Sequence, residues 1–184
     1  MKKITSLIKL ASLSQLKSFT QIEDLQIEEP TNNEFPIRGH WMAVILLKGT
    51  EIKIIFKAHF MTKNATALTS NIRKFESEEK LVTQALDFIK EYCNMTVGAI
   101  KRVLGEQDIS SGVSLPAIIR GFDDIFSDRA DGKESFAPCW TLKNQTTQID
   151  CSAWFEIYEV DSFAGFNFKE AENNIQGNNN IEFF

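Results

Sequence analysis

Two carboxylates and a carboxamide recur at helical spacing in the run DFIKEYCNMTVGAIKRVL, as Asp87, Glu91 and Asn94. At about 100° per residue, positions i, i+4 and i+7 lie within roughly 60° of each other on a helix. Carboxylates carry charge, and a carboxamide can donate to and accept from a water molecule without itself titrating. The stripe therefore has the character of a docking surface that carries polar chemistry.

Gly98 and Lys101 continue the same stripe. A glycine in mid-helix costs about 1 kcal/mol relative to alanine, and close approach by another molecule is one physical reason for it. The opposite side of the helix carries small and apolar residues, which predicts a buried face: Ala85, Ile89, Cys93, Thr96, Ile100 and Val103. A solvated helix face is the alternative interpretation, and residue type and spacing alone favour it.

The same Glu-x-x-Asn spacing recurs at Glu170 and Asn173. There Phe166 stands where the upstream carboxylate would be, and the surrounding sequence shows no helical periodicity. We interpret this second copy as a chance match, because short motifs often match by accident.

The elements that must position the stripe follow from hydrophobic periodicity and turn residues. Ser77 is a plausible N-cap for the long helix, and Gly105 is a stop signal for it. Predicted helices span 3–19, 65–74 and 77–104. Predicted strands form two hairpins, 37–47 with 51–60 and 136–142 with 148–160, and a further strand spans 113–122.

Pro116 lies within the strand predicted for 113–122 and cannot donate to a ladder, so this strand should be an edge or irregular there. The elements together predict an α+β fold, an antiparallel sheet of five or six strands with the helices packed on it. We expect one domain over 1–165 and a flexible, Asn-rich tail over 166–184.

Composition limits the possible functions. The chain has 184 residues, enough for one domain with a substantial core, and its net charge of −5 without a basic stripe argues against nucleic acid as a partner. Lys9 and Lys17 interrupt the apolar positions of the N-terminal segment, so it is not expected to be a signal peptide, and no apolar run approaches a membrane span. We expect a cytoplasmic protein without a membrane partner.

Other chemistry-bearing residues are poor candidates for a site. Cys139 and Cys151 could lie opposite one another in the second hairpin, where reduced thiols are favoured over a disulfide, and Cys93 fits the buried helix face. His40 and His59 stand among alternating apolar residues of the first hairpin and make a poor metal site. The acidic residues of 123–133 lack the pattern of a calcium loop. We predict no metal site.

The sequence resembles the CheC/CheX family of chemotaxis phosphatases. That family carries an acidic residue or Ser, then Glu, then Asn on one helix, followed by a strand of the form "sLPtvi-G". Here the strand reads SLPAIIRG over 114–121, and Pro116 stands twenty-two positions after Asn94. The matching helix positions are Asp87, Glu91, Asn94, Gly98, Lys101 and Leu104.

The resemblance implies a phosphorylated response regulator of the CheY kind as substrate and partner. Its aspartyl phosphate is an activated mixed anhydride, so catalysis needs only an in-line water and charge stabilisation. By the resemblance, Asn94 would orient the water and Glu91 would pair with the lysine beside the phosphorylated aspartate. Gly98 would allow close approach, with Asp87 and Lys101 as supporting contacts. Mg²⁺ would belong to the partner, and this chain would bind no cofactor.

Only one helix carries the full motif, as in the CheX type, so the resemblance implies two sites through a homodimer formed at sheet edges. An alternative of a different class remains open, a CheX-like module that binds a receiver domain or another signalling partner without hydrolysing it. A fold relative with no receiver partner is a third possibility.

Overall fold

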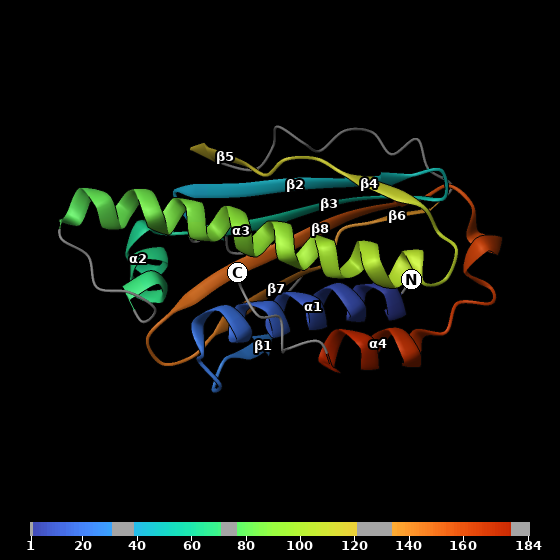
Figure 1. The fold of residues 1–184 in the computed structure, drawn as a ribbon, viewed down its shortest axis with the longest axis horizontal. Coiled ribbons are helices and arrows are strands. Elements are labelled where there is room, and N and C mark those ends of the chain that lie inside the picture. The colour runs from blue at the N-terminus through green and yellow to red at the C-terminus, as the bar shows by residue number, and fades with distance from the viewer. Residues whose placement is uncertain (1, 31–38, 71–76, 121–133, 178–184) are drawn as a thin grey trace.

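The computed structural model describes residues 2–30, 39–70, 77–120 and 134–177. Within these ranges the fold is α+β, with helices gathered on one face of an antiparallel sheet (Figure 1). The helices are α1 (Lys2–Thr20), α2 (Thr62–Ser70), α3 (Glu78–Gly105), the short 3₁₀ helix η2 (Val160–Phe163) and α4 (Phe168–Gly177). The strands are β1 (Gln26–Glu28), β2 (Trp41–Gly49), β3 (Ile52–Phe60), β4 (Ser111–Val113), β5 (Ala117–Arg120), β6 (Glu134–Phe136), β7 (Cys139–Lys143) and β8 (Gln148–Ile157).

The predicted α+β architecture is confirmed. Six strands follow one another in the order β1-β7-β8-β3-β2-β4, while the short β5 pairs with β2 and β6 pairs with β8. The predicted hairpins are both present, because β2 pairs with β3 and β7 pairs with β8, each antiparallel. The sheet thereby forms a continuous platform beneath the helices.

The strand predicted over 113–122 is two short strands, β4 and β5, that both pair with β2. Between them the Ser114 amide donates to the Leu46 carbonyl at 2.8 Å, and the Leu46 amide donates to Ser114 Oγ at 3.0 Å. Pro116, which has no N–H to donate, lies in the break, and the two strands lie on the β2 side of the sheet. The predicted irregularity at Pro116 is confirmed.

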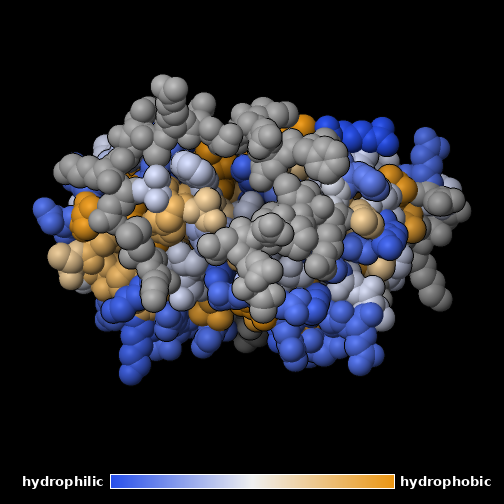
Figure 2. All heavy atoms as spheres, turned by 180° about the vertical axis from the view of Figure 1, so that it is seen from behind, coloured by the Kyte–Doolittle hydropathy of each residue, from blue (hydrophilic) through white to orange (hydrophobic). Residues whose placement is uncertain are grey.

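The two faces of the sheet differ. The helix-covered face is the main core, where alternate strand residues such as Phe56, Trp140 and Phe155 are fully buried. The other face mixes apolar and charged groups, as Figure 2 shows from behind. There the buried Glu156 carboxylate accepts hydrogen bonds from Tyr158 at 2.8 Å, Lys53 at 3.0 Å and Trp154 at 3.1 Å. These three bonds satisfy the buried carboxylate.

The long helix begins and ends where its sequence signals predict. Ser77 is the N-cap of α3, and its hydroxyl accepts from the Lys80 amide at 3.4 Å. The helix ends at Gly105, and the chain turns through Asp108, whose φ is 61°, into β4. The preceding helix, α2, begins at Thr62 and so starts three residues before the predicted 65. Residues 71–74 of that prediction lie outside the described residues.

The predicted flexible tail begins instead with a helix. Phe166, Ala171 and Ile175 are buried, and α4 packs against α1 and α3. The expected boundary at 166 is therefore wrong for residues up to 177, while 178–184 lie outside the described residues. The Asn-rich composition hides apolar positions at i, i+3 and i+7, namely Phe168, Ala171 and Ile175, which is one face of a helix.

The strand register separates the hairpin cysteines. Trp140 pairs with Cys151, and Cys139 pairs with Ser152, so Cys139 and Cys151 project from opposite faces of the sheet. This register excludes a disulfide between them, and the cysteines are free. His40 is exposed just before β2, while His59 is buried on β3. The acidic segment 123–133 lies outside the described residues.

Candidate functional site

The inner face of α3 fixes how the helix sits on the sheet. As predicted, Ala85, Ile89, Cys93, Thr96, Ile100 and Val103 are buried. Tyr92, inside the Glu-x-x-Asn motif, is also fully buried, and its ring meets Phe56 of β3 edge-on at 6.1 Å between centroids. Since packed aromatic rings interlock, the rotation of α3 about its own axis is set by the core.

A polar contact anchors the same residue. Tyr92 Oη lies 3.6 Å from Cys151 Sγ on β8, in hydrogen-bond contact. Burial raises the pKa of Tyr92 well above its ordinary value, and the neighbouring Cys151 raises it further. Burial likewise raises the pKa of Cys151, to about 12. Both groups therefore remain neutral, as suits a structural contact beneath the motif.

The outer face of α3 carries the predicted stripe. Asp87, Glu91, Asn94, Gly98 and Lys101 are all exposed, as the periodicity predicts. The side chains of Glu91 and Asn94 form no hydrogen bond or ion pair with any residue that the structure describes. Asp87 differs, because its carboxylate pairs with Lys90 Nζ at 2.5 Å. The side chains of Glu91 and Asn94 are thus available to a partner.

Gly98 faces open space. A Cβ atom built there would meet no heavy atom within 4 Å, so the fold of the free chain does not require a glycine. The absent side chain leaves bare backbone one turn beyond Asn94, where another molecule can approach closely. The structure thus supplies the geometry that the sequence predicts at this position, while the role of the stripe stays a prediction.

One exposed residue near α3 was not identified from the sequence. Leu115, in the break between β4 and β5, is 91% exposed, and both strands contact α3. The Ser114 hydrogen bonds to β2 hold this segment in place. Its sequence signal was the Pro116 break itself, which predicts that side chains there leave the pleated pattern.

The described residues contain no group of three or more His, Cys, Asp or Glu side chains that could hold a metal ion. Among the helices of the described chain, none has the length and apolar character needed to cross a membrane. A cavity of about 320 Å³ lies away from the stripe, at the end of β3 and the start of β8. No sequence signal pointed to it, since its walls come from separate segments.

No protein-family model and no curated protein matches this sequence. Solved structures do match it. The chemotaxis protein CheX from Vibrio vulnificus is 19% identical, with a TM-score of 0.64 over 85% of this chain and 100% of that chain. A CheC-like superfamily protein from Shewanella sp. PV-4 is 18% identical, with a TM-score of 0.65 over 84% and 97%.

A third similar structure is CheX from Borrelia burgdorferi, solved in a complex with CheY, BeF₃ and Mg²⁺. It is 17% identical, with a TM-score of 0.65 over 84% of this chain and 97% of that chain. These likenesses span nearly the whole of each similar chain and more than four fifths of this chain. This chain has the fold of the CheX and CheC-like chemotaxis proteins.

Proposed function

We propose that this chain is a member of the CheC/CheX family that accelerates hydrolysis of the aspartyl phosphate on a CheY-like response regulator. The observation that carries the proposal is the exposed pair Glu91 and Asn94, which have no partner among the described residues and stand on a helix anchored through Tyr92. The CheX-type fold supplies the context, and the similar Borrelia protein was solved with a CheY.

In this mechanism Asn94 holds a water molecule in line with the phosphorus of the aspartyl phosphate. Its carboxamide accepts from and donates to that water. The water oxygen forms a bond to phosphorus as the bond from phosphorus to the aspartyl oxygen breaks. A carboxylate and inorganic phosphate are released, and the water's proton passes to phosphate or solvent. Because the anhydride is already activated, positioning supplies most of the acceleration.

Glu91 anchors the helix by pairing with the lysine beside the phosphorylated aspartate. A charge-assisted contact of this kind is about twice as strong as a neutral hydrogen bond. Gly98 lets the partner's backbone approach, and Asp87 and Lys101 make supporting contacts. Asp87 must exchange or share its Lys90 pair to do so, and exposed pairs of this kind contribute little to stability. The receiver, not this chain, holds the Mg²⁺ that neutralises phosphoryl charge.

The proposed setting is a chemotaxis or related two-component pathway in the cytoplasm. As an assembly, we propose a homodimer joined at sheet edges that presents two copies of the stripe. Light scattering on the purified chain measures this directly: a monomer mass across the working concentration range contradicts the dimer, and leaves the chemistry at Asn94 to be tested separately.

The experiment that tests the phosphatase uses a CheY-like receiver from the same genome, phosphorylated with a small phosphodonor. Decay of the phosphorylated receiver is followed with wild-type chain, with Asn94→Ala and without added chain. We expect acceleration by the wild type and decay near the intrinsic rate with Asn94→Ala, while both bind the receiver. Receiver binding by the wild type without faster decay would instead support the non-catalytic module.

A further inference from the structure

The edge of the sheet beside α3 contains a β-bulge at Leu115. In β4 the last pair joins Val113 to Leu47 of β2. In β5 the first pair joins Ala117 to Val44 of β2. Between these two pairs lie two residues of β2 and three of the edge segment, so the edge segment has one residue more. Bulges of this kind re-aim a side chain and are common at sheet edges and next to active sites.

The backbone of Leu115 is held firmly although its side chain is in solvent. On one side Ser114 bonds to Leu46 through its amide at 2.8 Å and its hydroxyl at 3.0 Å. The Ser114 hydroxyl also donates to the Leu115 carbonyl at 3.1 Å. On the other side Pro116 fixes its own φ and keeps the residue before it extended. The leucine side chain is nevertheless 91% exposed, and on a fixed backbone it loses little freedom when a partner covers it.

The bulge lies beside the middle of α3. The helix ends at Gly105, and the chain then runs back along it through β4 and β5, which both contact α3 (Figure 1). From Ser111 to Leu115 the chain advances by four residues, or about 13 Å at the rise of a strand. The same length on a helix corresponds to about nine residues. Leu115 is therefore roughly abreast of Asn94 and Gly98.

The other flank of α3 is covered by helices. Phe88 of α3 contacts Phe19 of α1, with 5.7 Å between the ring centroids, and Asn174 of α4 donates to Glu106, just beyond α3, at 2.8 Å. Figure 1 shows α1 and α4 on one side of α3, and β4 and β5 on the other. A molecule that docks on the outer face of α3 can therefore extend over the edge strands and meet Leu115.

The stripe on α3 supplies polar contacts but no apolar side chain. Its exposed residues are charged or polar, or glycine. Burial of apolar surface is the main favourable term in most protein association, whereas charged contacts contribute more to specificity and to the rate of encounter. Leu115 is the large apolar side chain that the fold exposes beside the stripe. In the part of the chain that the structure describes, the other exposed one is Val160, which stands in η2 after the end of β8.

We infer that Leu115 is an apolar anchor of the receiver-docking surface. It packs against an apolar side chain at the rim of the receiver's phosphorylation site, while Glu91 and Asn94 enter that site. The identity of the partner rests on the proposed function. A second copy of this chain is a poorer occupant, because the bulge and the missing N–H of Pro116 interrupt the backbone groups that an added strand would need.

The test measures the affinity of the full chain for a CheY-like receiver from the same genome. The receiver is loaded with Mg²⁺ and beryllofluoride, a stable substitute for the aspartyl phosphate. Leu115→Ala should weaken binding about tenfold, through loss of most of a leucine side chain from the interface. Leu115→Met, which keeps the volume, should bind as the wild type. Val160→Ala is the matched control and should also leave affinity unchanged. All three variants should resist denaturant as the wild type does, because both side chains are exposed.

Steady-state kinetics separate this role from catalysis. With the phosphorylated receiver, Leu115→Ala should raise the receiver concentration that gives half of the maximal rate by about tenfold. The maximal rate itself should stay unchanged, because Leu115 does not touch the reacting atoms. Asn94→Ala should lower the maximal rate instead.

The outcomes distinguish this inference from the phosphatase proposal. Wild-type affinity in Leu115→Ala would overturn the inference, whether or not the chain accelerates dephosphorylation. A wild-type chain that binds the beryllofluoride-loaded receiver without accelerating decay contradicts the phosphatase alone, and the affinity of Leu115→Ala still decides the inference. A wild-type chain that binds no receiver contradicts both. If Leu115→Ala converts a dimer to a monomer in light scattering but keeps its receiver affinity, the leucine belongs to a contact between copies, which also overturns the inference.

Discussion

Two helices of the described chain carry the Glu-x-x-Asn spacing, and these two copies have different surroundings. Glu91 and Asn94 stand in the middle of a 28-residue helix, while Glu170 and Asn173 stand on the 10-residue α4. All four side chains are exposed. The expectation of a flexible tail without helical periodicity around the second copy is wrong, since α4 spans that copy.

What separates the copies is how their glutamates are used. Glu170 Oε2 accepts from Asn167 Nδ2 at 3.0 Å, and the Glu170 amide donates to Asn167 Oδ1 at 3.2 Å. This reciprocal pair caps the start of α4, so Glu170 is occupied by the fold. Glu91 has no such partner in the described chain. The comparison teaches that a short motif becomes a candidate site only where the fold leaves its polar groups unused.

The two copies should differ most in how much stability is lost when the residue after the glutamate is changed. Tyr92→Ala removes a fully buried aromatic ring and its contact with Cys151, and should lower the free energy of unfolding by about 3–5 kcal/mol. Ala171→Gly, the matched change in the second copy, should cost only about 1 kcal/mol. Denaturant unfolding measures both. Equal losses would show that α3 is no more firmly anchored than α4.

The next largest difference is expected when the asparagine of each copy is replaced by alanine. Asn94→Ala should reduce the acceleration of receiver dephosphorylation by roughly 10²–10³-fold, the cost of removing one positioned polar group from a reacting centre. Asn173→Ala should leave the rate unchanged, because the glutamate three residues before it, Glu170, is engaged by Asn167. Phosphate release is the measurement for both variants. A loss of activity in Asn173→Ala would mean that the second copy takes part in the chemistry.

Gly98→Leu tests the docking surface with a smaller effect. The free chain should be as stable as wild type or slightly more so, since the new side chain meets open space and leucine favours helix by about 1 kcal/mol over glycine. Receiver affinity should fall about tenfold through overlap with the partner. Gly105→Leu, on the same exposed side and also open, is the control. Unchanged affinity in Gly98→Leu would remove the close-approach role.

Local signals in the sequence were sufficient for α3 and its stripe. A sustained 3.6-residue period, the Ser77 cap and the Gly105 stop all act within one helix, so the exposed and buried faces could be predicted residue by residue. The helix around the second copy, α4, could not be predicted, because it lacks such local signals. Its apolar positions are few and lie among asparagines, and α4 depends on packing against α1, a contact between opposite ends of the chain.

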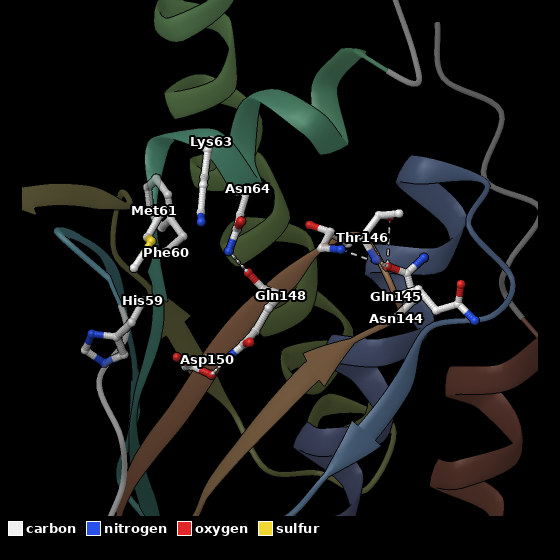
Figure 3. A pocket seen from close by; sticks show the side chains of 11 residues that line it. His59, Phe60, Met61, Lys63, Asn64, Asn144, Gln145, Thr146, Gln148 and Asp150 are labelled. Carbon is white, nitrogen blue, oxygen red and sulfur yellow. Dashed lines mark hydrogen bonds between the residues drawn. The ribbon is translucent and has the colours of Figure 1, made fainter.

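Neither the register of the strands nor the cavity could be predicted from such local signals. The one-residue offset that separates Cys139 from Cys151 is set by the turn at 144–147, and a slip of one residue reverses every side chain. The walls of the cavity come from segments that are far apart in sequence, and they lie together only because β3 lies beside β8 (Figure 3). Neither arrangement follows from the residue pattern of a single element.

The smallest expected effect distinguishes the glutamates. Glu170→Ala removes an exposed capping contact and should lower the free energy of unfolding by roughly 0.5–1 kcal/mol, without changing receiver affinity. Glu91→Ala should do the reverse: stability is kept, because its side chain contacts no described partner, and receiver affinity falls. Thermal unfolding measures the stability of each variant, and titration with the receiver measures its affinity. If Glu91→Ala destabilises the chain as much as Glu170→Ala does, the α3 glutamate is a structural residue and the contrast between the copies fails.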